Sequence, residues 1–301
     1  MGFCWAAKVD SYSKYYLDLN NCETNKMELS DSHMHTELCG HAQGHPVEYV
    51  EMAARLGLTR VTITCHMPLE IPAFGGPRIR MPLERYPEYL ELIEAARFRG
   101  DEVGVEVLKG IEAEVFPDAP VQKRIGLWLK EQSFDFVLGS LHHHTDAYQS
   151  WLRDHGKFSD DDKIKTYFAD IADGDRTGLF DSMSHPDVIR IYGTLEGAFM
   201  PELYETEIRA AIAAAVEQDI CWEVNTSGLL KGDYLAHPDP LILKWGCEMG
   251  LKLTMGSDAH LPRSVGHAFR RMISELNQIG FKTIHYFRGR ERIEVPIEIG
   301  L

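Results

Sequence analysis

Short apolar runs alternate with helix-like stretches along most of the chain. The apolar runs end near Ser32, Cys65, Ile111, Ser140, Met183, Asn225 and Met255. Between them, apolar residues recur with helical spacing over 46–58, 83–99, 121–131, 162–172, 201–218 and 240–249. Strands that alternate with helices of this length are typical of βα units and a parallel sheet. The pattern therefore predicts seven βα units that close into an α/β barrel.

The two ends of the chain depart from this alternation. Residues 1–27 mix aromatic and polar side chains without a clear period, so we interpret them as an N-terminal extension. Near the other end, the pattern predicts a helix over 265–276 and a hairpin from 283–287 and 292–297. Proline and glycine cluster at 71–82, which predicts a loop on the functional side of the barrel. Residues 28–301 are expected to form a single domain.

Charge and cysteine content narrow the class of partner. The 301 residues carry 31 Lys and Arg against 46 Asp and Glu, a net charge of −15. Such an acidic chain is unsuited to long nucleic acids or anionic membranes, but a small phosphorylated substrate remains compatible. The six cysteines show no CxxC spacing, which favours reduced thiols. With no apolar run long enough to span a membrane and no signal-peptide pattern, a cytoplasmic location is expected. No apolar helix or exposed strand indicates a partner subunit.

Side chains that commonly bind metals follow the predicted strands. His33 and His35 are two residues apart, so on a strand they project to the same side. One polar residue after one strand can simply cap the next helix, but every predicted strand except the sixth is followed by a metal-ligand type. The carboxyl ends of barrel strands converge on one face. We therefore predict one multinuclear site from His33, His35, His41, His66, Glu112, His142, His185, Asp258 and His260.

The mixture of imidazole and carboxylate donors indicates the kind of metal. Such donors suit Zn, Fe or Mn, and the lack of paired thiolates argues against a structural zinc site. Carboxylates that bridge two ions about 3.5–4 Å apart suit in-line displacement at phosphorus. The sequence thus favours a metal-dependent hydrolase.

Seven segments, in order, resemble the motifs of the PHP (polymerase and histidinol phosphatase) superfamily. They are 31–41 (DSHMHTELCGH), 64–69 (TCHMPL), 110–114 (GIEAE), 139–142 (GSLH), 184–187 (SHPD), 223–228 (EVNTSG) and 256–260 (GSDAH). The resemblance covers about residues 29–270, and its last two motifs are most similar to those of histidinol-phosphate phosphatases. It implies a distorted (β/α)7 barrel, similar to a TIM barrel, that holds three divalent ions.

The resemblance also implies which residues hold each ion. His33, His35, Glu112 and Asp258 match ligands of the first ion. Glu112, as a bridge, joins His142 and His185 at the second, and His41, His66 and His260 match ligands of the third. Two positions depart from the family pattern: Cys65 replaces a glutamate, and Leu230 stands where a basic residue often occurs, with Lys231 displaced by one.

Several polar residues near the strand ends are candidates for substrate binding. Arg190 is predicted to clamp phosphate, because a planar guanidinium suits it; the other candidates are Arg263, Arg153, Lys231, Asn225 and His143. Carboxylates at Glu114, Asp118 and Asp187 are available for a cationic amine. Five further histidines are interpreted as surface or structural residues: His45, His155, His237, His267 and His285.

The hypothesis from the sequence is hydrolysis of L-histidinol phosphate to L-histidinol and phosphate. Glu112, Asp258, His260 and Arg190 are the expected catalytic residues. Three alternatives stay open: a PHP phosphoesterase for another small phosphate ester or nucleotide, an amidohydrolase, and a metal-dependent protein without catalysis. Amidohydrolase sites often use a bridging modified lysine, and no lysine closes a predicted strand here. An intact set of nine ligands weighs against a protein without catalysis.

Overall fold

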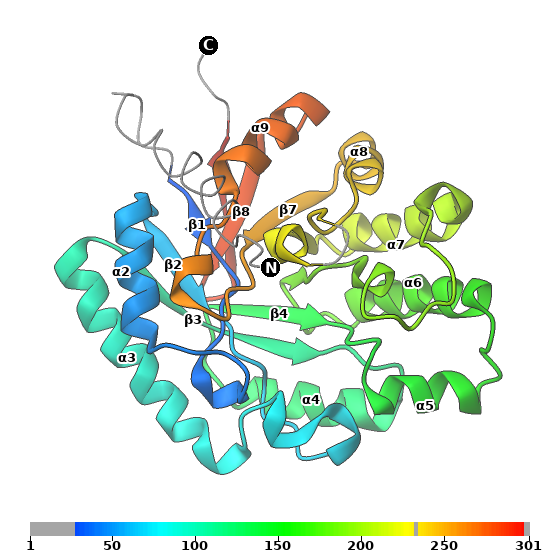
Figure 1. Ribbon diagram of the computed structural model, residues 1–301, viewed down its shortest axis with the longest axis horizontal. Helices are drawn as coiled ribbons and strands as arrows, with labels where there is room; N and C mark the ends of the chain where they lie inside the picture. The colour runs from blue at the N-terminus through cyan, green and yellow to red at the C-terminus, as the bar shows by residue number, and fades with distance from the viewer. Residues whose placement is uncertain (1–27, 232–233, 298–301) are drawn as a thin grey trace, which may run out of the picture.

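The computed structural model describes residues 28–231 and 234–297 (Figure 1). The predicted N-terminal extension lies outside the described residues. One sheet carries all the described strands, ordered as in the chain. They are β1 (Ser30–Asp31), β2 (Arg60–Ile63), β3 (Glu106–Glu114), β4 (Phe136–Ser140), β5 (Ser182–Met183), β6 (Cys221–Asn225), β7 (Lys252–Gly256), β8 (Thr283–Arg288) and β9 (Glu291–Pro296).

The first seven strands close into a barrel. Neighbouring strands from β1 to β8 are parallel. The Ser32 N–H donates to the Met255 carbonyl over 2.9 Å, and the His35 N–H donates to the Ala259 carbonyl over 2.9 Å. These bonds join the end of β1 to the end of β7. The prediction of seven βα units in a TIM-like barrel is therefore confirmed.

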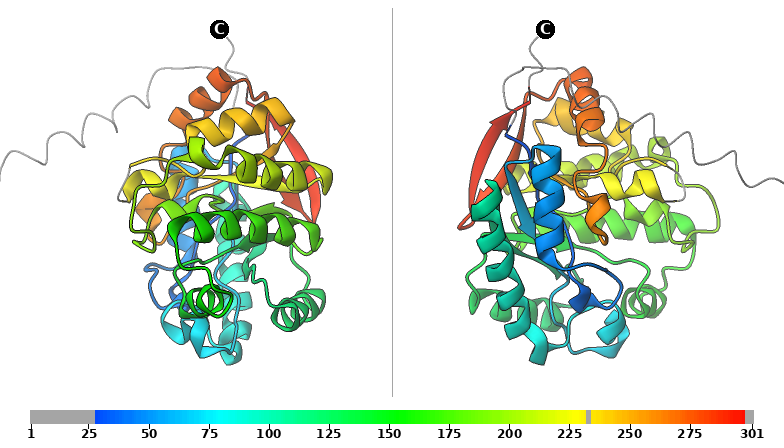
Figure 2. Two further views of the ribbon diagram at one scale, coloured as in Figure 1. Left: turned by 90° about the vertical axis from the view of Figure 1, so that its right-hand side faces the viewer. Right: turned by 60° about the vertical axis from the view of Figure 1, so that its left-hand side comes forward.

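The predicted C-terminal hairpin is also present. β8 joins β7 where His285 pairs with Thr254, and β9 runs antiparallel to β8. In Figure 2 this hairpin, drawn in red, forms one outer edge of the molecule.

Helices surround the strands (Figures 1 and 2). They are α2 (Pro46–Leu56), α3 (Tyr86–Val103), α4 (Ala119–Lys130), α5 (Asp146–Asp154), α6 (Asp160–Arg176), α7 (Glu205–Glu217), α8 (Pro240–Met249) and α9 (Phe269–Ile279). Short 3-10 turns lie between a strand and the helix that follows it: η1 (Glu37–Cys39), η2 (Pro72–Phe74), η3 (Gly76–Arg78), η4 (Leu83–Arg85), η5 (Val188–Arg190), η6 (Pro201–Tyr204), η7 (Thr226–Leu230) and η8 (Pro262–Ser264).

Local sequence signals explain where several helices begin and end. The His45 ring and the Glu48 carboxylate form a capping box at the start of α2, and Gly57 ends that helix with φ 73°. The nine-residue α5 was not predicted, because it is short and largely polar; Thr145 caps it. α9 begins four residues later than predicted, because Ala268 adopts φ 58° just before it.

Side chains between the helices and the strands form the core. Trp222 of β6 is fully buried, and its indole N–H donates to the Asp175 carboxylate of α6 over 3.3 Å. Burial raises the pKa of Asp175 from its ordinary 3.8 to about 8, although the Trp222 hydrogen bond opposes the shift. The folded protein therefore retains this proton at neutral pH, while the unfolded chain releases it.

This difference predicts a pH-dependent stability. Between about pH 4 and pH 8 the folded state binds the extra proton, so Asp175 lowers the free energy of unfolding as pH rises. Between pH 5 and pH 7, the free energy of unfolding of Asp175→Asn should rise by up to about 2–3 kcal/mol relative to that of wild type. Each pH unit in this range contributes up to about 1.4 kcal/mol, the free energy that corresponds to one pKa unit. Urea unfolding at several pH values measures this gain. Asp173→Asn, an exposed change on the same helix, is the control, and an equal pH dependence in all three proteins would contradict the prediction.

No helix within residues 28–231 and 234–297 is long and apolar enough to cross a membrane.

Candidate metal centre

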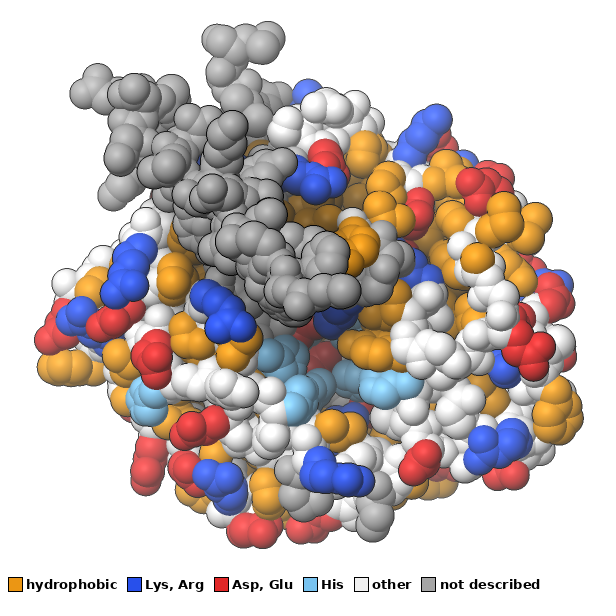
Figure 3. Space-filling model, in the orientation of Figure 1, with side chains coloured by type: hydrophobic (Ala, Val, Ile, Leu, Met, Phe, Trp, Pro, Cys, Tyr) orange, Lys and Arg blue, Asp and Glu red, His pale blue; other side chains and the backbone are white. Residues whose placement is uncertain are grey.

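The nine predicted ligands lie together at the carboxyl ends of the barrel strands. Figure 3 shows several of the histidine side chains meeting in a hollow on one face. Glu112 belongs to β3, and the other eight come from segments that follow β1, β2, β4, β5 and β7: His33, His35, His41, His66, His142, His185, Asp258 and His260. The barrel topology thus brings together side chains that are as far apart in the sequence as His33 and His260.

Glu112 stands at the centre of the cluster. Its Oε2 lies 2.7 Å from His66 Nδ1 and 3.6 Å from His35 Nε2. Its Oε1 lies 3.4 Å from the Nε2 atoms of both His142 and His185. One carboxylate therefore faces imidazoles from four different strand ends, as a bridging ligand must.

Asp258 forms a second centre of the cluster. Its Oδ1 lies 3.1 Å from His35 Nε2, 3.6 Å from His33 Nε2 and 3.4 Å from His260 Nδ1. On the outer side, His260 Nε2 lies 2.8 Å from His41 Nε2. All nine predicted ligands therefore belong to one continuous cluster.

The donor atoms fit metal ions better than they fit one another. Both oxygens of Glu112 are buried and have no hydrogen-bond donor. Ring nitrogens face each other at 3.1 Å between His33 and His35, a repulsive contact unless a proton or a cation lies between the two lone pairs. Three groups made only of predicted ligands have donor atoms within 4.8 Å of one another: His33, His35 and Asp258; His66, Glu112 and His142; and His35, His66 and His260. The residues present therefore fit a multinuclear metal site.

The ionisation states also suit metal binding. Burial alone would raise the pKa of Glu112, but His66, His33 and His142 hold it well below its ordinary value. Burial likewise opposes ionisation of Asp258, yet the Lys231 ammonium and His33 lower its pKa. Both carboxylates are thus anionic at neutral pH, the form that binds a cation.

A buried carboxylate on β6 supports two of these ligands from behind. Glu223 Oε1 lies 2.8 Å from His33 Nδ1, while Oε2 accepts the His185 N–H over 3.0 Å. A Cβ at Gly256 would lie 2.1 Å from Glu223 Oε1, so glycine is required beside it. Sequence reasoning missed Glu223, although a charged residue inside a buried strand was an available signal. The sixth strand thus supplies a residue that holds two of the predicted ligands in place.

The cluster forms the floor of a cavity of about 420 Å³. Arg80 and Lys231 are the two cationic side chains among the described residues that line it. Lys231 Nζ donates to Ser227 Oγ over 3.0 Å and to Asp258 Oδ2 over 3.3 Å. Although the family's basic position is Leu230 here, the displaced Lys231 still reaches the site. Leu230 also lines the cavity.

Arg80 was not predicted as a site residue. It lies within the loop at 71–82, between η3 and η4, and the sequence did place this loop on the same side of the barrel. Its guanidinium pairs with Glu114 and donates through Nε to the Phe74 carbonyl over 2.9 Å. One buried nitrogen, Nη1, has no hydrogen-bond partner. Glu114 in turn lies 2.8 Å from His142 Nδ1, which fixes the orientation of that ring.

Arg190 does not line the cavity. Its guanidinium pairs with Asp187 and donates to the carbonyls of Leu235 and Ala236 over 2.7 Å and 2.8 Å. These bonds secure the loop that follows η7. The predicted phosphate clamp is therefore not placed at the site, because Asp187, three residues earlier, holds its side chain.

Two further candidates turn away from the cavity. Asn225 accepts from the N–H of Ser227 with its Oδ1 and donates to Glu223 with its Nδ2, so it caps η7. His143 is buried and bonds to Val188 and Thr194, whereas its neighbour His144 lines the cavity.

The two remaining arginine candidates lie on the surface. Arg153 is on α5, where it donates to Ser150 over 2.8 Å, and the exposed Arg263 is in η8. Neither lines the cavity. The carboxylates considered for an amine are also engaged elsewhere: Glu114 with Arg80, Asp187 with Arg190 and His237, and Asp118 as the cap of α4.

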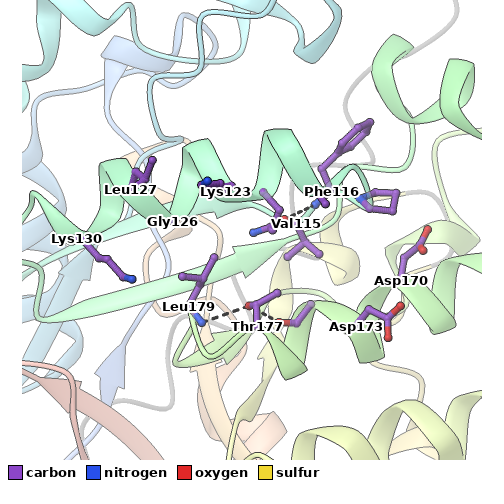
Figure 4. A pocket seen from close by; sticks show the side chains of 14 residues that line it. Val115, Phe116, Lys123, Gly126, Leu127, Lys130, Asp170, Asp173, Thr177 and Leu179 are labelled. Atoms are coloured by element: carbon purple, nitrogen blue, oxygen red, sulfur yellow. Dashed lines mark hydrogen bonds between the residues drawn. The ribbon is translucent and has the colours of Figure 1, made fainter.

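A second cavity, of about 480 Å³, lies between α4 and α6 (Figure 4). Its ionisable lining residues are Lys123, Lys130, Asp170 and Asp173. The metal-type cluster lies in the smaller cavity, and chemistry rather than size identifies that cavity as the candidate site.

Comparisons with known proteins agree with this geometry. The PHP domain model matches residues 31–227. A probable histidinol-phosphatase of Deinococcus radiodurans is 32% identical over 274 residues, covering 87% of this chain and 98% of the relative. A probable histidinol-phosphatase of Schizosaccharomyces pombe is 25% identical, covering 84% and 87%.

A solved structure shares the fold. The histidinol phosphate phosphatase of Lactococcus lactis, solved with zinc, L-histidinol and phosphate, has a TM-score of 0.70 and 19% identity, and the match covers 88% of this chain and 99% of that one. The barrel, the cluster of histidines and carboxylates, and the match over residues 31–227 lead to one conclusion: this chain belongs to the PHP domain family.

Proposed function

We propose that this protein is a metal-dependent phosphatase that hydrolyses L-histidinol phosphate to L-histidinol and phosphate. The observation that carries the reaction class is the buried Glu112 carboxylate, whose two oxygens face four imidazoles and lack hydrogen bonds. The relatives named as probable histidinol-phosphatases support the choice of substrate. In the reaction, water adds to phosphorus and the alcohol oxygen leaves with a proton.

The proposed site holds three divalent ions, of zinc, iron or manganese. His33, His35, Glu112 and Asp258 would hold the first ion; Glu112, His142 and His185 the second; and His41, His66 and His260 the third. Bound there, the ions would supply positive charge at the phosphate and lower the pKa of water. Glu112 and Asp258 are the acidic ligands. A cytoplasmic location remains part of the proposal.

The chain's own cations complete the binding of phosphate. Lys231 Nζ stands beside Asp258, and Arg80 lines the same cavity with an unpaired buried Nη1. Charge-assisted hydrogen bonds from these two groups would neutralise the phosphate oxygens. Both replace Arg190 in the role expected from the sequence.

Phosphate release from a panel of esters tests the substrate. The metal-loaded protein should hydrolyse L-histidinol phosphate with a kcat/KM of about 10⁴ M⁻¹s⁻¹ or more, the lower end for natural substrates. Nucleoside monophosphates, a cyclic phosphodiester and generic phosphomonoesters should react much more slowly. Similar, slow rates on all of these esters would support phosphoesterase activity but would contradict L-histidinol phosphate as the natural substrate.

A further inference from the structure

Tyr192 occupies an unusual position at the mouth of the cavity. It lines the cavity, is 51% exposed and adopts φ 70°, and Gly193 follows with φ 67°. A bulky side chain with positive φ is uncommon, and such strain persists where surrounding contacts hold it. An exposed aromatic ring held in this way is accessible to a ligand in the cavity.

The segment that carries Tyr192 is fastened on both sides. His143 Nε2 lies 3.1 Å from the Val188 carbonyl, and His143 Nδ1 lies 2.9 Å from Thr194 Oγ1. One tautomer satisfies both contacts, with Nε2–H donating to the carbonyl and Nδ1 accepting from the hydroxyl. Lys163 Nζ also donates to the Thr194 carbonyl over 3.0 Å. These bonds hold the chain on both sides of Tyr192 in place.

The upper wall of the cavity is aromatic and apolar. The rings of Tyr192 and His144 lie 4.5 Å apart between centroids, tilted by 36°. Leu230, 54% exposed, lines the same cavity. Lys231 links this wall to the floor, since its Nζ lies 5.7 Å from the Tyr192 ring centroid and 3.3 Å from Asp258. The cavity is thus charged at its floor and aromatic at its mouth.

We propose that Tyr192 and His144 bind a planar ring in the leaving alcohol, so that the site selects phosphate monoesters whose alcohol carries an imidazole or aromatic ring. The inference rests on the proposed function. A phosphate held at the floor directs the rest of the ester toward the mouth, where Tyr192 offers a preoriented face. Stacked or tilted ring pairs are favourable beyond the area that they bury. Aliphatic esters gain no such contact.

The test compares Tyr192→Leu with Tyr192→Phe, because both keep a large apolar side chain but only the second keeps a ring. We measure kcat/KM for L-histidinol phosphate and for 2-aminoethyl phosphate, which has the amine and the phosphate without the ring. In the Leu variant, kcat/KM for L-histidinol phosphate divided by kcat/KM for 2-aminoethyl phosphate should fall roughly 2- to 10-fold, which corresponds to the contribution of one aromatic pair. Tyr192→Phe should keep the ratio. Phe158→Leu, an exposed change outside the cavity, is the control.

Inhibition by L-histidinol gives a second measure that does not require turnover of the ring-free ester. Its inhibition constant should rise by a similar factor in the Leu variant. Suppose that wild type hydrolyses L-histidinol phosphate, but that Tyr192→Leu changes neither the ratio of the two kcat/KM values nor the inhibition constant. This result would overturn the proposed ring contact and leave the proposed function intact. If the metal-loaded wild type hydrolyses neither ester, the proposed function fails, and the ring contact that rests on it fails as well.

Discussion

Glu112→Gln should lower kcat/KM for L-histidinol phosphate by more than about 100-fold, since even residues that only orient a ligand typically cost 10- to 100-fold. The substitution removes the negative charge from the one carboxylate that faces His66, His35, His142 and His185 together. Steady-state phosphate release measures the activity, and elemental analysis of the purified variant measures the bound metal. The activity and the amount of bound metal should both fall in the variant.

Glu91→Gln is the matched control for this change. Glu91 is exposed on α3, so its replacement alters the charge of the chain equally without touching the cluster. Its activity and metal content should equal those of wild type. If Glu112→Gln kept near-normal turnover and metal, Glu112 would not be a bridging ligand.

Glu223→Gln should weaken metal binding by about 10- to 100-fold, the usual effect of losing a group that orients a histidine ligand. Burial alone would lower the pKa of His33, but Glu223, together with Asp258 and Glu112, raises it well above its ordinary value. A neutral amide would remove the carboxylate that fixes the His33 ring from behind and would weaken the acceptor of the His185 N–H.

Competition with a chelator measures metal affinity in wild type and in Glu223→Gln. Glu217→Gln, an exposed change at the end of α7, is the control. Excess metal should restore most of the activity of Glu223→Gln, because the ligands themselves remain. Unchanged affinity together with lost activity would instead place Glu223 in the chemistry, and unchanged affinity and activity would remove it from the site altogether.

The position of the candidate ligand cluster could be predicted from the sequence, because in a parallel barrel the end of each strand in the sequence determines where the following side chains lie. All strands of a parallel barrel end on the same face, so His35 and Asp258 lie 3.1 Å apart although 223 positions (258 minus 35) separate them in the chain. The strand and helix pattern was informative for the same reason: α8 was predicted with its observed bounds, Pro240–Met249.

Substrate-facing residues were harder to predict, because they depend on contacts that spacing does not encode. Arg190 lies close behind a ligand in the sequence, yet Asp187 and the carbonyl of Ala236 hold its guanidinium. His143 and His144 differ by one position, and only the backbone path after β4 decides that the second lines the cavity. Arg80 lies in an irregular loop, and no hydrophobic periodicity in the sequence predicts the course of that loop.

A metal titration tests the central claim most directly. The protein is freed of metal with a chelator, and zinc or manganese is added back in steps. Phosphate release from L-histidinol phosphate and the amount of bound metal are followed in the same samples. We predict negligible turnover without metal and a rise in activity that follows occupancy of the cluster. Full turnover of the chelated protein, with no response to added metal, would contradict the assignment of the cluster as a hydrolytic metal centre.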